Sequence, residues 1–184
     1  MAQEHRARHK AHLDQHVIKD VGGTYHYVGD WYVLSGGRRA LVPFSLWVVL
    51  TAALVIAAGC GSFRGLMNTW YVILPYVGTV GMLLGLGLQA WRMVSGGGRL
   101  KTFDYARMQD RVVPFAGTLV LLAVLTAGLG GVFLALAGEK PQASDALFFA
   151  PMLLSAAASR MAISAFRAQK WLRENGRLPS KGDL

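Results

Sequence analysis

Four long apolar runs constrain the fold of this chain more than any other feature. They occupy residues 41–60, 68–91, 112–137 and 146–168. Each run is close to the roughly 20 apolar residues that cross a hydrocarbon layer about 30 Å thick as a helix. Arg160 is the only charged residue in the interior of a run, and 16% of the chain is charged, against about 25% in soluble domains. The sequence therefore predicts an all-α integral membrane protein built as a four-transmembrane-helix bundle.

Basic residues gather on one side of the predicted spans. The segment before the first run holds Arg6, Arg8, Lys10, Lys19, Arg38 and Arg39. The loop between the second and third runs holds Arg92, Arg99, Lys101, Arg107 and Arg111. The tail holds Arg167, Lys170, Arg173, Arg177 and Lys181. Because such loops stay in the cytoplasm, we predict a multi-pass protein of the cell (cytoplasmic) membrane with both termini cytoplasmic. The net charge of +9 favours anionic lipid headgroups as partners. Nucleic acid is not a predicted partner, since the basic residues lie at span ends rather than on one folded face.

The runs divide the chain into a cytoplasmic N-terminal segment, a transmembrane domain and a basic cytoplasmic tail, at residues 1–40, 41–168 and 169–184. Residues 1–20 are predicted to form a small helix. Two β-rich stretches at 24–28 and 31–34 follow, separated by Gly29 and Asp30. Because a Gly-Asp pair suits a two-residue turn, we predict a β-hairpin here.

Two polar segments lie next to the predicted spans. The loop before the third span is expected to hold a short amphipathic piece at 103–111. The tail beyond Trp171 is polar, and we expect it to fray.

The four spans resemble two halves of a parallel repeat. Val-Pro-Phe occurs at 42–44 and again at 113–115, near the starts of the first and third spans. Pro75 and Pro151 then lie in early turns of the second and fourth spans. We predict two two-helix repeats, with the alternative that proline is simply tolerated in the first turn of any helix.

Small residues recur at helical spacing in the last three spans. They are Gly78, Gly81 and Gly85; Ala123, Ala127, Gly131 and Ala135; and Ser155, Ser159 and Ala162. Because small side chains allow close backbone approach in lipid, these stripes predict a tightly packed bundle. The alternative use of a stripe is a homodimer contact or a substrate groove, for which Gly81 and Gly85 are the candidates.

Four histidines near the N-terminus share one face of the predicted helix. His5, His9, His12 and His16 are spaced by four, three and four residues. Pairs four apart suit zinc or nickel, and clustered imidazoles also suit a pH sensor. The neighbouring basic residues oppose a cation, so a solvated or partner-contacting face is favoured and no cofactor is predicted; a metal site is the alternative.

Arg160 is a candidate functional residue because a charge inside a membrane span is costly. Three interpretations fit its place near the end of the fourth span. The guanidinium either snorkels to the interface, or bonds to the backbone or Ser159 in the bundle interior, or binds an anion or a lipid headgroup. The sequence leaves these open.

No histidine or carboxylate lies in any span, and no nucleophile–base set emerges, so we predict that the chain is not an enzyme. The leading hypothesis is an accessory or scaffolding subunit of a membrane complex, embedded in the lipid bilayer as a homodimer or with another membrane protein. The alternative is a small dimeric transporter or lipid flippase that uses Arg160. A third hypothesis is a metal-handling protein that uses the N-terminal histidines.

Overall fold

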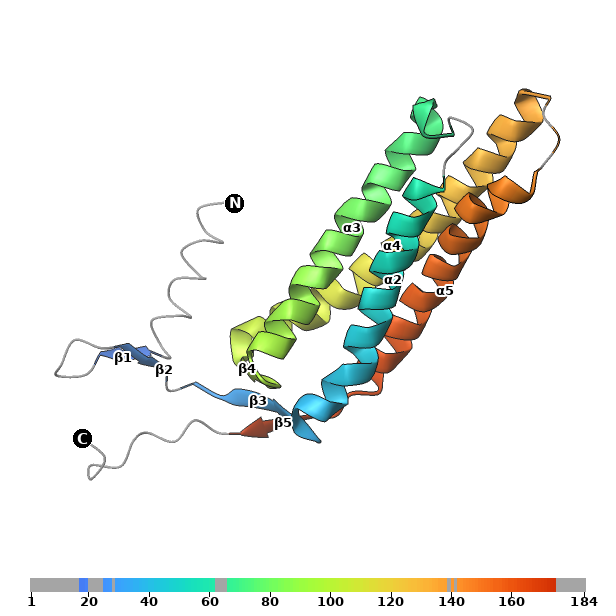
Figure 1. Cartoon of the computed structure of the whole chain (residues 1–184). Helices are drawn as coiled ribbons and strands as arrows, with labels where there is room; N and C mark the ends of the chain where they lie inside the picture. Colours follow the sequence, from blue (N-terminus) through green and yellow to red (C-terminus); the bar gives the residue numbers. More distant parts are fainter. Residues whose placement is uncertain are drawn as a thin grey trace.

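The computed structural model is a bundle of four antiparallel helices with a small sheet at one end (Figure 1). It describes residues 17–19, 25–27, 29–61, 66–138, 140 and 142–174. The long helices are α2 (Val42–Cys60), α3 (Trp70–Ser95), α4 (Thr102–Leu136) and α5 (Ala146–Arg167). Short 3-10 turns, η1 (Gly37–Leu41), η2 (Leu66–Asn68) and η3 (Ala143–Asp145), precede α2, α3 and α5. All four long helices are long and apolar enough to cross a membrane, which confirms the predicted helix bundle at that level.

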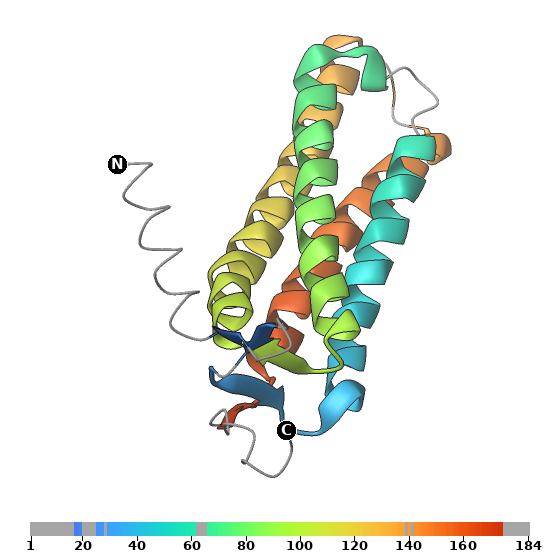
Figure 2. The same cartoon turned by 90° about the vertical axis from the view of Figure 1, so that its left-hand side faces the viewer.

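The helices do not pack equally around the bundle. The most extensive packing is between α2 and α5, and the α3–α4 and α4–α5 pairs also pack extensively, whereas α2 and α3 make fewer contacts with each other. Both views of the structure place α2 and α3 alongside one another (Figures 1 and 2). The ring of helices is therefore tight on three sides and looser on the fourth.

Large apolar side chains cover the outside of the bundle as well as its interior. Leu46, Leu84, Leu121 and Leu154, one from each helix, are all more than half exposed. In contrast, the buried hydroxyls of Thr51, Thr79, Thr126 and Ser159 donate hydrogen bonds to carbonyls four residues back in their own helices. Apolar side chains on the outside, and buried hydroxyls bonded to their own helices, are what a hydrocarbon solvent favours.

Three strands from distant parts of the chain form a sheet across one end of the bundle. They are β3 (Trp31–Leu34), β4 (Arg99–Lys101) and β5 (Trp171–Glu174). The strand order is β4-β3-β5, with antiparallel pairing on both sides of β3. Leu34 and Leu100 are buried and belong to the same core cluster as Phe44 and Phe166. The sheet is therefore packed on the bundle and closes one end of its core; we call this the sheet end.

The predicted hairpin between residues 24–28 and 31–34 is wrong in its pairing. Tyr25–Tyr27 forms a strand, β2, but it pairs with β1 (Val17–Lys19), while β3 pairs with β4 and β5. Asp30 makes no turn of a hairpin, because its carbonyl accepts hydrogen bonds from the backbone and hydroxyl of Thr102. A three-stranded sheet packed on helices is more stable than an isolated hairpin, so the longer-range pairing prevails.

Three other boundaries differ from the sequence prediction. Residues 17–19 of the expected N-terminal helix are a strand, and residues 1–16 lie outside the described part. The amphipathic piece at 103–111 is the beginning of α4, which continues through Pro114; within a long helix the loss of one backbone N–H is tolerated. The first four residues after Lys170 do not fray but form β5.

Candidate functional site

Arg160 and Ser159, predicted as a substrate or headgroup site, point in different directions from α5. Arg160 is exposed on the outer surface of the helix. Ser159 is fully buried, and its hydroxyl donates to the carbonyl of Ser155 at 2.8 Å rather than to any ligand. The predicted hydrogen bond between Arg160 and Ser159 in the bundle interior is therefore not formed.

The two candidate glycines lie on another helix and also have separate surroundings. A methyl group added at Gly85 would meet the Phe115 ring at 3.0 Å, so Gly85 serves the close approach of α3 and α4. A methyl group at Gly81 would meet nothing within 4 Å. These residues do not line one site with Arg160 or Ser159.

The predicted histidine face, formed by His5, His9, His12 and His16, lies outside the residues that the structure describes. Within the described ranges, no group of three or more His, Cys, Asp or Glu side chains is arranged to hold a metal ion.

A groove runs between α2 and α3, on the loosely packed side of the bundle. It has a volume of about 580 Å³ and is lined almost entirely by apolar side chains, among them Val49, Ala52, Val80 and Leu84. Gly87 also lines it, and a methyl group there would meet nothing within 4 Å. The volume lies within the range of about 300–1,000 Å³ that is typical of small-molecule sites.

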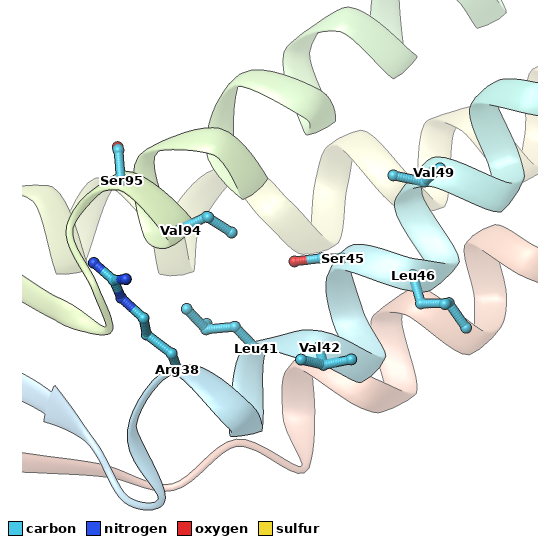
Figure 3. Close-up of a pocket in the computed structure, with 8 residues that line it drawn as sticks. All are labelled: Arg38, Leu41, Val42, Ser45, Leu46, Val49, Val94 and Ser95. Atoms are coloured by element: carbon cyan, nitrogen blue, oxygen red, sulfur yellow. The ribbon is translucent and has the colours of Figure 1, made fainter.

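The groove continues toward the sheet end into a second hollow of about 480 Å³ (Figure 3). Ser45, Val49 and Val94 line both hollows, so the two are continuous. Arg38, from η1, lines the second hollow and extends its side chain toward the end of α3 (Figure 3). The groove is therefore apolar along its length and has one cationic side chain, Arg38, at the sheet end.

Two polar groups of this groove lack a partner among the described residues. The Ser45 hydroxyl oxygen is buried without a hydrogen-bond partner, and Figure 3 shows it directed between α2 and α3. Arg38 forms no ion pair among the described residues, and its guanidinium lies over Gly97, where an added methyl group would be 3.4 Å from Nε. Gly97 has φ +64°, so a side chain there is strained as well as crowded.

The sheet end carries a second organised surface. Asp30 accepts hydrogen bonds from Nε and Nη2 of Arg173, and this bond and the carboxylate charge raise the pKa of Arg173. Arg99 donates to Glu174 at 3.0 Å across the sheet. Under the sheet, the Tyr105 ring of α4 stacks on Tyr32 at 3.9 Å. These contacts connect all three strands with α4.

The sequence pattern alone singles out neither Arg38 nor Ser45. Arg38 is one of several basic residues before the first span, and Ser45 is a lone serine near the start of that span. Their spacing is the only sequence signal, since a cation at the interface precedes a hydroxyl in the span by seven positions.

The chain has no significant match to any protein-family model, curated protein or solved structure. The site must therefore be interpreted from its own geometry.

Proposed function

We propose that this chain is a multi-pass membrane protein that acts as an accessory or scaffolding subunit of a membrane complex and catalyses no reaction itself. Its sheet end would face the cytoplasm, because basic residues such as Arg38, Arg99 and Arg173 gather there. The partner would be another membrane protein or a second copy of the chain.

The observation that carries the scaffolding role is the sheet. Its strands come from three segments, an ion pair joins β4 to β5, and aromatic stacking attaches β3 to α4, so it is a rigid surface rather than a loose tail. The outer edges of β4 and β5 pair with no other strand in the part of the chain that the structure describes. Open strand edges are common docking sites, because an added strand gains main-chain hydrogen bonds. Leu172 on β5 adds an exposed apolar side chain.

Site-specific photocrosslinking tests this role. A photoreactive residue at Leu172, in cells that express the full chain, is expected to yield a discrete protein adduct. The matched control places the same residue at Leu136, which is also more than half exposed but lies at the opposite end of the bundle. Equal adducts from both positions, or none from position 172, would contradict the scaffolding role.

The orientation has its own test, because the chain contains one cysteine. Cys60 is exposed and ends α2 at the far side from the sheet. A membrane-impermeant maleimide is expected to label Cys60 from outside intact cells, and to label S95C in a C60S background only after the membrane is opened. The reverse pattern would overturn the orientation.

The groove between α2 and α3 is the observation that favours the second candidate, a dimeric transporter or lipid flippase. Vesicles containing the protein would then accelerate the exchange of labelled lipid between leaflets, whereas a scaffold would not. The metal-handling hypothesis predicts that removal of residues 1–20 abolishes zinc or nickel binding.

A further inference from the structure

We propose that the groove between α2 and α3 binds one anionic phospholipid, with an acyl chain along the two helices and the phosphate on Arg38. This goes beyond the scaffolding role. It rests only on the membrane insertion proposed above, which the experiment measures separately.

The shape and lining of the groove fit an acyl chain. The groove opens sideways between the helices, and its long part presents side chains such as Ala52, Val80 and Leu84. Gly87 leaves open space where any other residue would project. In a bilayer this surface faces lipid tails, and a recess between two helices orders one of them.

The charged group of the groove lies at one end, as the polarity of a phospholipid requires; the Tyr76 hydroxyl at the other end donates to the carbonyl of Val55. Arg38 lies at the mouth, at the end where the helices meet the basic sheet. The guanidinium presents several donors in a plane and suits phosphate better than a lysine would. Because Arg38 has no acidic partner among the described residues, an anionic headgroup supplies the missing charge.

Ser45 accounts for the region between headgroup and chain. It lies seven positions after Arg38, about 12 Å along the 3-10 turn and the first turn of α2. Its buried, unpartnered hydroxyl is one of few such atoms in the described part of the chain. An unmet hydroxyl in a membrane span is costly. Its oxygen is buried in the conformation described, so an ester oxygen of the lipid satisfies it once the Ser45 side chain rotates toward the groove. Arg38, Ser45 and the apolar part of the groove thus follow one another in the same order as the phosphate, the ester and the acyl chain of a phospholipid.

The experiment uses the full chain reconstituted in phosphatidylcholine vesicles that contain a trace of phosphatidylglycerol with a photoactivatable acyl chain. Flotation of the vesicles first shows whether the protein is inserted. After illumination, adducts are expected on α2 and α3 residues that line the groove. G87L fills the open space and is expected to abolish these adducts. G81L is the control, since Gly81 has equal space on the same helix but does not line the groove.

The headgroup is tested with a second pair of variants. R38Q is expected to reduce phosphatidylglycerol labelling about fivefold, which corresponds to about 1 kcal/mol for one basic residue at an anionic surface. R39Q removes the neighbouring charge, which does not line the groove, and is expected to have a smaller effect. A probe with a phosphatidylcholine headgroup is expected to label the wild type and R38Q equally.

Several results would overturn the proposal. If the protein floats but G87L and G81L label alike, no groove site exists. If R38Q and R39Q lower labelling equally, the attraction is a general surface effect. If G87L instead converts a dimer to a monomer, the groove belongs to a second copy of the chain. If G87L does not fold, the arginine pair decides. Failure to float would refute membrane insertion itself, and with it both proposals.

Discussion

Gly130 lies where α4 packs tightly against two phenylalanine rings of α5, and a single methyl group there is expected to destabilise the protein. An added Cβ would lie 2.9 Å from Phe148 Cε1 and 3.2 Å from Phe149 Cε1. The Phe148 ring is fully buried and packs edge-on against Phe149, with centroids 5.2 Å apart. Because the Phe148 ring is packed on all sides, accommodating the methyl group requires the ring or the helices to shift.

The magnitude follows from a comparison with a neighbouring glycine. A methyl group at Gly128 would meet nothing within 4 Å. Both Gly→Ala changes gain about 1 kcal/mol of helix propensity, which cancels in the comparison. Overpacking a filled site costs about 1–3 kcal/mol. We therefore expect G130A to be less stable than G128A by about 1–3 kcal/mol.

Unfolding in mixed micelles, with increasing dodecyl sulfate and detection by circular dichroism, measures this difference. The midpoint should fall in G130A while the slope stays constant. The additional change F148L should remove part of the penalty, giving a coupling free energy of about 0.5–3 kcal/mol between the two sites. G130A as stable as G128A would refute the close packing of α4 on α5.

Other predictions test the burial pattern and the sheet. L119A should lower the free energy of unfolding by about 2–3 kcal/mol, because Leu119 is fully buried. L121A should lower it by less than about 1 kcal/mol, because Leu121 is two-thirds exposed. Equal losses would mean that the inward and outward faces of α4 are misassigned. D30N should return the pKa of Arg173 toward its ordinary value. It should also speed amide hydrogen exchange at Trp171–Glu174 while leaving exchange in α4 unchanged. An unaltered exchange rate in β5 would show that the Asp30–Arg173 ion pair does not stabilise that strand.

The sequence was sufficient to predict the four helices, because each needs only a long uncharged run. Their faces were harder to predict. The stripe at Ala123, Ala127, Gly131 and Ala135 has a strict spacing of four, which drifts around a helix of 3.6 residues per turn. Ala123 and Ala127 are buried, but Gly131 and Ala135 are exposed, and Gly130 takes the next place in the interface. In α5, the mixed spacing of Ser155, Ser159 and Ala162 follows the helix, and all three are buried.

The sheet and the groove could not be predicted from local pattern. Asp30 and Gly29 have the composition of a hairpin turn, but Arg173 and Thr102, far away in the chain, are the partners of Asp30. The groove depends on α2 and α3 being less closely packed than the other neighbours, which no single helix sequence encodes. Features set by two or more distant segments were therefore missed, whereas those set by one segment were found.

The central strand of the sheet, β3, is synthesised early, but its pairing partner β5 is synthesised late. Asp30 and Arg173 are 143 positions apart, so at about 5–20 residues per second β3 waits about 7–30 s for β5 to be synthesised. Trp171 pairs with Leu34, so β5 completes the sheet only after all four helices have been synthesised. Under the membrane topology proposed above, a chain that skips one crossing would carry β5 to the opposite side of the membrane and leave that edge of β3 unpaired.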